Sequence, residues 1–245
     1  MTELRLFGLI GFPLTHSFSP DYFRQKFQRE HIEAAYNPFV LETISQLPEL
    51  LQNYPSLEGL NVTIPYKESV MPYLDELSAL ARETGAVNCI RIADGKLTGY
   101  NTDVAGFCES LKPLLNSQHQ HALVLGTGGA SKAVQFGLKE LGIGYQLVSR
   151  REEQGKRSYT ALTRRQMRDY QLIINTTPVG MYPDTEACPP LPYEVIGPDH
   201  LLFDLIYNPE ETRFLAEGRK RGAVTKNGLE MLQLQAEESW KIWNE

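Results

Sequence analysis

A short glycine-rich turn constrains the fold of this chain more than any other feature of its sequence. The apolar run Ala122–Leu125 leads directly into Gly126-Thr127-Gly128-Gly129-Ala130-Ser131, and a helical pattern follows. This order predicts a dinucleotide site, because the glycines let the backbone approach a pyrophosphate and the helix N-terminus attracts its charge. The third position of the fingerprint is Ser131 instead of glycine or alanine. A plain strand-to-helix turn without a ligand is the alternative interpretation.

The residues around this turn predict a parallel sheet. Further strands are expected at Tyr145–Ser149, Leu172–Asn175 and Leu201–Leu205, all rich in Val, Ile or Leu and without strict alternation. Such strands are typical of a sheet that is covered on both faces. We therefore expect an α/β protein with a Rossmann-like, doubly wound dinucleotide-binding domain. The polar segment Asn116–His121 indicates a domain boundary nearby.

The N-terminal half is predicted to form a separate α/β unit. Its apolar runs predict strands at Arg5–Ile10, Tyr36–Val40, Gly59–Ile64, Gly85–Ile92 and Gly95–Tyr100. A helix is expected from Pro20 to Glu30, with Ser19 as its cap. The last two strands are expected to pair as a hairpin around Ala93-Asp94-Gly95. Apolar residues at three- and four-residue steps predict an amphipathic helix from Gly228 to Trp243.

Composition and charge exclude several classes of protein. The 245 residues carry a net charge of −6, which argues against a general nucleic-acid or anionic-membrane binder. No apolar run approaches the ~20 residues of a membrane span, and the first residues do not resemble a signal peptide. Cys89, Cys108 and Cys188 are too few and too scattered for a disulfide framework or a zinc knuckle. We expect a cytoplasmic protein without a metal site.

A basic stretch follows the second strand of the predicted dinucleotide domain. Residues 150–168 hold seven basic and two acidic side chains. Arg150 lies 24 residues after Gly126, and Arg151 follows it. NAD sites usually place an acid near this position, so the two arginines favour the 2′-phosphate of NADP. Glu152 could instead accept a hydrogen bond from an unphosphorylated ribose. A solvated basic surface is the remaining interpretation.

Polar residues in the N-terminal half are candidates for a binding site. Ser17 and Ser19 could direct two hydroxyls at one anion, although a turn residue and a helix cap would have the same sequence. Asn61 and Thr63 fall on one face of a strand that ends shortly before Lys67. That pattern also fits a half-exposed strand followed by a surface lysine.

Two further stretches add an amide and a carboxylate. Asn88 ends Gly85-Ala86-Val87-Asn88, and Asp103 ends Gly99-Tyr100-Asn101-Thr102-Asp103. An aspartate within reach of Lys67 could orient that lysine for proton exchange. Alone, Asn88 or Asp103 would more often be a turn residue.

Taken together and in this order, these stretches resemble the shikimate dehydrogenase family over nearly the full chain. The matching runs are GLIGFPLTHSFSP, GLNVTIPYK, GAVNCI, GYNTD, GTGGAS, SRR, IINTTPVGM, DLIYNPEETRFL and NGLEMLQLQAE. The resemblance implies a substrate domain at 1–104, completed by a C-terminal helix at 226–245, and an NADP-binding domain at 105–225. It implies reversible, NADPH-dependent reduction of 3-dehydroshikimate to shikimate in chorismate and aromatic amino-acid biosynthesis, by a monomer or homodimer.

The resemblance also implies residue roles. Lys67 is the expected catalytic lysine, paired with Asp103. The expected substrate contacts are Ser17, Ser19, Asn61, Thr63, Asn88, Tyr207 and Gln235. The expected cofactor contacts are Gly126, Gly128, Gly129, Ala130, Ser149, Arg150, Arg151, Thr176, Met181, Gly228 and Met231. A cyclic polyhydroxy acid fits this set, because it needs an anion clamp, neutral hydrogen-bonding groups and one proton-exchanging group.

The connection after Ser149 departs from the family pattern. The segment between Ser149 and Tyr159 is too short for the usual crossover helix, which is therefore expected to be lost or shortened. The shortened connection and Glu152, which could bind an unphosphorylated ribose, leave an NAD-using quinate/shikimate dehydrogenase as the alternative enzyme. A methyltransferase also has a glycine-rich turn but needs no Lys67–Asp103 pair, and a dinucleotide-dependent sensor would be favoured by loss of that pair.

Overall fold

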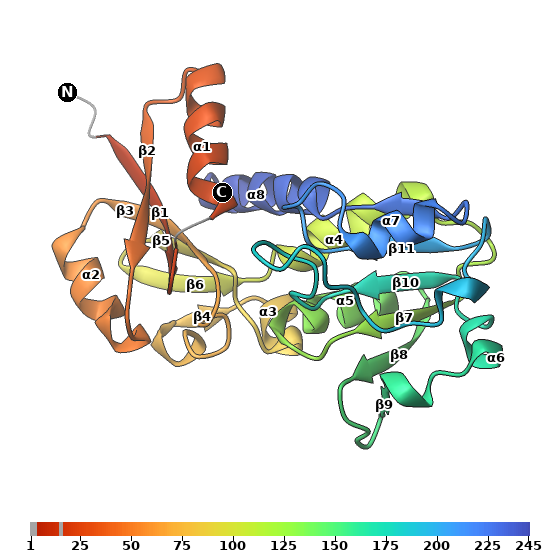
Figure 1. Cartoon of the computed structure of the whole chain (residues 1–245). Coiled ribbons are helices and arrows are strands. Elements are labelled where there is room, and N and C mark those ends of the chain that lie inside the picture. The colour runs from red at the N-terminus through yellow and green to blue at the C-terminus, as the bar shows by residue number, and fades with distance from the viewer. Residues whose placement is uncertain (1–3, 15–16) are drawn as a thin grey trace. The chain divides into compact units, whose positions relative to one another are not determined.

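The computed structural model describes residues 4–14 and 17–245, which form two compact units (Figure 1). Unit 1 comprises Met1–Ala105 and Gln233–Glu245, and unit 2 comprises Gly106–Leu232. Each unit contains one six-stranded sheet. The boundary lies before the polar segment Asn116–His121, because Phe107 packs edge-on against Phe203 of the unit 2 sheet. Within the described ranges, no helix combines the length and hydrophobicity that a membrane crossing requires.

The unit 1 sheet has the strand order β2-β1-β3-β5-β6-β4. Its strands are β1 (Arg5–Gly11), β2 (Ala34–Val40), β3 (Leu57–Val62), β4 (Glu76–Leu77), β5 (Cys89–Ala93) and β6 (Lys96–Tyr100). The first three run parallel, whereas β5 is antiparallel to both β3 and β6. The predicted hairpin is confirmed, since Asp94 and Gly95 between β5 and β6 both have positive φ, as a tight two-residue turn requires.

The helices of unit 1 correct one prediction about the serine pair. They are α1 (Phe18–Arg29), α2 (Leu47–Asn53), α3 (Ala79–Thr84) and the part of α8 (Leu229–Trp243) that falls in this unit. Helix α1 starts at Phe18, so Ser17 is its N-cap residue and Ser19 lies within the first turn. The expectation that Ser19 caps this helix is wrong. Pro20 still falls in the first turn. A backbone N–H there would have no partner within the helix, so proline costs no helical hydrogen bond.

An aromatic cluster fixes α8 against the unit 1 sheet. Trp243 stacks on Phe7 with ring centroids 4.8 Å apart, and its indole N–H donates to the carbonyl of Ile90 at 3.0 Å. Gly59 of β3 leaves room for this ring, because a Cβ there would lie 2.2 Å from the indole nitrogen. The end of α8 is thereby held over β3 and β5.

The unit 2 sheet is parallel throughout, with the order β12-β11-β10-β7-β8-β9. Its strands are β7 (His121–Leu125), β8 (Gly144–Ser149), β9 (Lys156–Ser158), β10 (Leu172–Asn175), β11 (Leu201–Asp204) and β12 (Val224–Lys226). Its main helices are α4 (Asp103–Leu111), of which the part from Gly106 onward falls in this unit, α5 (Gly129–Glu140), α6 (Arg164–Met167) and α7 (Arg213–Arg219). The chain builds outward from β7 in one direction and then from β10 in the other, which confirms the doubly wound, Rossmann-like prediction.

The predicted loss of the crossover helix after β8 is confirmed. Residues 150–155 alone connect β8 to β9, and they contain no helix. A parallel pair normally needs a longer connection. Here β9 pairs through only three residues, so an extended link of this length, which reaches ~20 Å, is sufficient.

Two buried histidines precede strands β7 and β11. The Nδ1 atoms of His119 and His200 accept backbone hydrogen bonds from Asn116 and Gly197, each at 3.1 Å. Burial lowers the pKa of both imidazoles, and the proximity of His200 lowers that of His119 further. Among the described residues, His200 Nε2 is the one buried side-chain nitrogen or oxygen without a hydrogen-bond partner.

We expect these histidines to make the protein less stable in mild acid. The unfolded chain binds protons at histidine near pH 6.5, whereas the folded pKa values are lower, so the free energy of unfolding falls as the pH drops below about 6.5. The test is to compare thermal melts of the parent and of His200→Asn, whose side chain still offers an acceptor to the Gly197 N–H. Between pH 8 and pH 5, the melting temperature should fall less in the variant than in the parent. Other groups that titrate in this range, such as Asp204, are present in both proteins and affect both equally. Equal losses would contradict the assignment.

Candidate functional site

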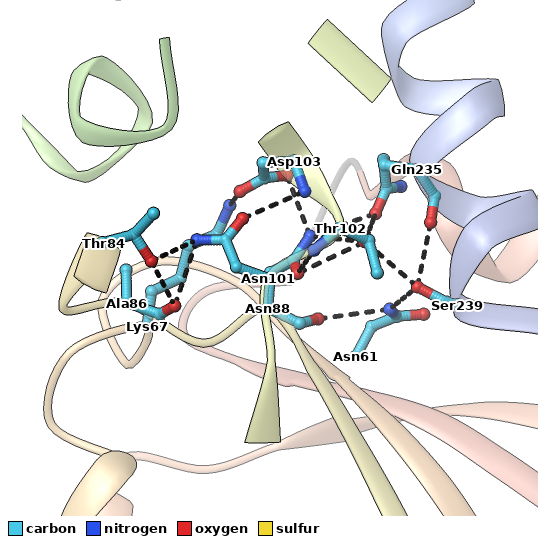
Figure 2. A network of polar contacts seen from close by, with 10 residues as sticks. All are labelled: Asn61, Lys67, Thr84, Ala86, Asn88, Asn101, Thr102, Asp103, Gln235 and Ser239. Carbon is cyan, nitrogen blue, oxygen red and sulfur yellow. Dashed lines mark hydrogen bonds and ion pairs between the residues drawn. The ribbon is translucent and has the colours of Figure 1, made fainter. Parts of the chain in front are cut away.

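A buried polar network occupies one end of the unit 1 sheet (Figure 2). Its members are Asn61, Lys67, Thr84, Ala86, Asn88, Asn101, Thr102, Asp103, Gln235 and Ser239. Strand register brings them together, because Asn61 pairs with Cys89, and Cys89 pairs with Tyr100 on the next strand. Helix α8 adds Gln235 and Ser239. Most of the amides and hydroxyls are thus held by neighbours within a single unit.

Lys67 and Asp103 form the charged part of this network. Lys67 Nζ donates to Asp103 Oδ2 at 2.6 Å, and their side chains are 21% and 12% exposed. This exposure leaves the pair mostly shielded from water but reachable by a ligand. Asp103 is the first residue of α4, where the positive end of the helix dipole stabilises a carboxylate. Its own N–H donates to Asn101 Oδ1 at 3.1 Å.

Asn101 fixes the backbone that carries Asp103, and the sequence did not single it out. Its side-chain amide donates to Thr84 Oγ1 at 3.1 Å and to the carbonyl of Ala86 at 3.0 Å. One sequence signal was available for Asn101, namely its place two residues before Asp103. An asparagine side chain in a turn often accepts a hydrogen bond from the backbone N–H two residues further on.

Asn88 is the centre of the network, and acceptors surround both hydrogens of its side-chain amide. Its Oδ1 accepts from Thr102 N at 2.7 Å and from the Thr102 hydroxyl at 3.2 Å. Its two amide hydrogens face Asp103 Oδ1 at 2.9 Å, Thr102 Oγ1 at 3.0 Å and Gln235 Oε1 at 3.3 Å. An amide has only two hydrogens, so Asn88 organises Asp103 and Gln235 and must release one of these acceptors to donate a hydrogen bond to a ligand.

Asn61 is joined to α8 and β2. Tyr36 donates its hydroxyl hydrogen to Asn61 Oδ1 at 2.8 Å. Asn61 Nδ2 donates to the carbonyl of Asn88 at 3.2 Å and to Ser239 Oγ at 2.9 Å. Tyr36, Thr102 and Ser239 were not predicted as site residues, although Ser239 lies four residues after Gln235 and hence on the same helical face.

The remaining predicted substrate residues of unit 1 lie near the ends of β1 and β3. Ser17 is half-buried and its side chain caps no helical N–H. Ser19 is buried and hydrogen-bonds to Tyr36, which offsets part of the burial that raises the tyrosine pKa. Thr63 follows β3, and its methyl group packs so closely on Gly11 that a Cβ there would lie 2.5 Å away.

The glycine-rich turn of unit 2 has the geometry of a phosphate cradle. Gly126 has φ +107° and lies against Thr176, whose hydroxyl donates to the carbonyl of Leu125 at 2.7 Å. A Cβ at Gly128 or Gly129 would meet nothing within 4 Å, so open space faces the N-terminus of α5. No side chain caps that helix. The backbone N–H groups are therefore available to an anion.

Ser131 explains the departure at the third position of the fingerprint. Its hydroxyl donates to the carbonyl of Gly126 at 2.9 Å, and the residue is completely buried. Serine thus closes the turn by a hydrogen bond where the usual small residue provides only close packing.

The other predicted cofactor residues lie on loops of unit 2. Ala130 is in the first turn of α5, and Ser149 ends β8 with Arg150 and Arg151 exposed after it. Thr176 and the exposed Met181 follow β10. Met231 is buried in α8, and Gly228 precedes that helix. Packing alone requires glycine at 228, because a Cβ would lie 2.1 Å from the carbonyl oxygen of Leu205.

Tyr207 is the one predicted substrate residue that falls in unit 2. It lies half-buried in the loop after β11. Its role in substrate binding stays a prediction.

A second buried network, which the sequence did not reveal, holds the loops after β10 and β11. Asp204 accepts from Asn175 Nδ2 at 3.0 Å and from the Thr212 hydroxyl at 2.6 Å. Burial raises the pKa of Asp204 to about 6 despite these bonds. The loops that carry Thr176 and Tyr207 therefore follow strand ends that are joined by the hydrogen bond between Asn175 and Asp204.

Comparison with known proteins identifies the family. Residues 9–90 match the family model described as the shikimate dehydrogenase substrate binding domain. The chain is 35% identical over 255 residues to a shikimate dehydrogenase (NADP(+)) of Methanosphaera stadtmanae, an alignment that covers 96% of this chain and 90% of the relative. The chain belongs to the shikimate dehydrogenase family.

Solved structures of shikimate dehydrogenases have the same fold. The enzyme of Aquifex aeolicus matches with a TM-score of 0.88 and 35% identity, covering 100% of this chain and 94% of that one. The enzyme of Thermus thermophilus, solved in complex with NADP(H) and shikimate, matches with a TM-score of 0.87 and 33% identity, covering 98% and 93%. These similarities confirm the two α/β parts predicted from the sequence.

Proposed function

We propose that this protein is an NADP-dependent shikimate dehydrogenase that reversibly reduces 3-dehydroshikimate to shikimate in chorismate and aromatic amino-acid biosynthesis. The observation that carries the proposal is the Lys67–Asp103 ion pair, set among the neutral amides and hydroxyls of the unit 1 network. A polyhydroxylated ring acid needs many neutral hydrogen bonds and one proton-exchanging group, and this network supplies both. The names of the curated relatives and their nearly full coverage of the chain support the same reaction.

Lys67 is the proposed proton donor. In the direction of reduction, Lys67 Nζ delivers a proton to the ring oxygen that changes from carbonyl to hydroxyl, and it takes the proton back in the reverse direction. Asp103 holds the ammonium group in place through its Oδ2 atom, while its Oδ1 atom accepts from Asn88. Both proton transfers are general acid–base steps.

Substrate binding is proposed for the other residues of the site. Ser17 and Ser19 bind the carboxylate at the start of α1. Asn61, Thr63, Asn88 and Gln235 bind the ring hydroxyls, and Tyr207 adds a further contact. Ser17 supports this assignment because its hydroxyl caps no N–H of the helix.

Unit 2 is proposed to bind NADP, whose nicotinamide supplies the hydride. The open space beside Gly128 and Gly129, and the uncapped start of α5, fit a pyrophosphate. Gly126, Ala130 and Ser149 line the same turn and strand end, and Thr176, Met181, Gly228 and Met231 are assigned to the nicotinamide side. The predicted domains, 1–104 with 226–245 for the substrate and 105–225 for NADP, are proposed to divide the labour. Gly228 and Met231 are the exception, because they belong to the 226–245 segment but lie in unit 2 and are assigned to the cofactor.

Arg150 and Arg151 are proposed to select NADP over NAD. Both are exposed, and exposed ion pairs contribute only ~0–1 kcal/mol each. We therefore expect Arg150→Ala to lower catalytic efficiency with NADP by up to about fivefold, more at low salt, and to leave NAD almost unaffected. Steady-state kinetics with both cofactors measure this effect. Arg168→Ala, an exposed arginine of the same basic stretch, is the control.

Equal losses with both cofactors in Arg150→Ala, or a parent enzyme that prefers NAD, would make Glu152 the determinant instead. The second candidate function, an NAD-using quinate/shikimate dehydrogenase, rests on Glu152, an exposed acid directly after the arginines. The deciding experiment follows NADPH absorbance with shikimate or quinate and each oxidised cofactor. Reduction of NADP by shikimate supports the proposal, and reduction of neither cofactor excludes both enzymes and favours a sensor. We propose a cytoplasmic monomer or homodimer.

A further inference from the structure

We propose that Tyr36 and Ser239 are positioning residues that determine which end of the Asn61 amide faces the substrate. The inference rests on the proposed function, in which Asn61 contacts a ring hydroxyl. It goes beyond that function because it assigns a polarity to this contact: Asn61 accepts a hydrogen bond from the substrate and donates none.

The hydrogen bonds of Asn61 define this polarity. Both hydrogens of Asn61 Nδ2 are in use, one on the carbonyl of Asn88 at 3.2 Å and one on Ser239 Oγ at 2.9 Å. Asn61 Oδ1 accepts a single hydrogen bond, from the Tyr36 hydroxyl at 2.8 Å. A carbonyl oxygen has two lone pairs, so one acceptor position is left for a ligand.

Ser239 is fixed as an acceptor towards Asn61. The residue is completely buried on α8, and its hydroxyl donates to the carbonyl of Gln235 at 2.9 Å. A hydroxyl has one hydrogen, so the lone pairs of Ser239 Oγ face Asn61 Nδ2 and, at 3.3 Å, the Thr102 hydroxyl. The turn of α8 that places Gln235 in the site thus also orients Asn61 (Figure 2).

Tyr36 is fixed as a donor at the opposite end of the amide. Its ring stacks on Phe23 with centroids 4.6 Å apart, which holds the hydroxyl in place. Burial keeps the pKa of this hydroxyl well above its usual value, so the hydroxyl is protonated at neutral pH. Loss of either partner lets the amide rotate and present an N–H to the substrate.

The test compares Ser239→Ala and Tyr36→Phe with Ser110→Ala. Ser110 is a matched control, since it is a buried helical serine whose hydroxyl also donates to a backbone carbonyl, that of Phe107 at 3.0 Å. We expect KM for shikimate to rise about tenfold in Ser239→Ala and Tyr36→Phe, with kcat and its pH profile nearly unchanged. The pH profile separates this effect from damage to the Lys67–Asp103 pair. Ser110→Ala should retain the parent KM.

The side-chain amide signals of Asn61, assigned by comparison with Asn61→Asp, give a second readout in the unliganded protein. We expect them to shift in Ser239→Ala and Tyr36→Phe and to stay in place in Ser110→Ala. An active parent whose KM is the same in both variants would overturn the inference, as would an equal rise in Ser110→Ala. A parent enzyme that is inactive with shikimate would overturn the proposed function. In that case the amide signals still test the inference, and unshifted Asn61 signals in Ser239→Ala and Tyr36→Phe would show that these residues do not position Asn61.

Discussion

Replacement of Lys67 with alanine should lower the turnover of shikimate by about 10²–10⁴-fold, the usual contribution of a general acid–base group. Of the ten residues in Figure 2, Lys67 is the only cation, and its Nζ atom lies 2.6 Å from Asp103 Oδ2. Its removal takes away the proposed proton donor but leaves Asn61, Asn88 and Gln235, which are proposed to bind the ring. We therefore expect the dissociation constant of shikimate to change far less than kcat.

The control for this experiment is Lys96→Ala. Lys96 is an exposed lysine of the same unit, paired with Glu76 on the surface, and its loss should leave kcat unchanged. Single-turnover rates and equilibrium binding of the purified variants separate chemistry from affinity. Normal turnover in Lys67→Ala would exclude the lysine from the reaction.

The second large effect is expected for Asp103→Asn, with kcat lowered by about 10²-fold or more. The carboxylate accepts from Lys67 Nζ at one oxygen and from Asn88 Nδ2 at the other. An asparagine has the same size but one acceptor, so its own amide hydrogens must face one of these donors. Either orientation releases Lys67 or disturbs Asn88, and the negative charge beside the lysine is lost.

Asp75→Asn is the matched control for this substitution. Asp75 is an exposed carboxylate of unit 1 that accepts from the backbone N–H of Leu97 at 2.7 Å. Both variants should melt cooperatively, and only Asp103→Asn should lose turnover. A kcat within a few-fold of the parent in Asp103→Asn would mean that Lys67 needs no carboxylate partner.

Much of the fold could be predicted because its signals are local. The turn after Leu125 needs positive φ at Gly126, and the turn after β5 needs it at Asp94 and Gly95. The apolar strands β7, β10 and β11 have the buried character that their composition predicts. Errors occurred where local rules compete. Both Ser17 and Ser19 suit a helix cap, and the backbone makes Ser17 the N-cap residue, although its side chain caps no N–H.

The candidate site could be predicted only in part. Lys67, Asp103, Asn61, Asn88 and Gln235 were expected from the family resemblance, and the structure brings all five together in unit 1. Their supporting residues were missed, because Asn101, Thr102, Tyr36 and Ser239 are ordinary residue types for a turn, a strand or a helix. Nothing in their immediate sequence distinguishes a structural hydroxyl or amide from one that orients a ligand contact.

The sequence by itself determined the two α/β parts, the dinucleotide turn and the residue types available for catalysis, since these depend on backbone sterics and hydrophobic periodicity over a few residues. Only the tertiary structure decided which polar atoms meet. Lys67 and Asp103 are 36 positions apart, and Asn61 and Ser239 are 178 positions apart. The pairing of β3, β5 and β6, and the packing of Trp243 that holds α8 over them, bring these atoms within hydrogen-bond distance. Because buried polar groups need partners, that packing also decided which of these groups bond to one another.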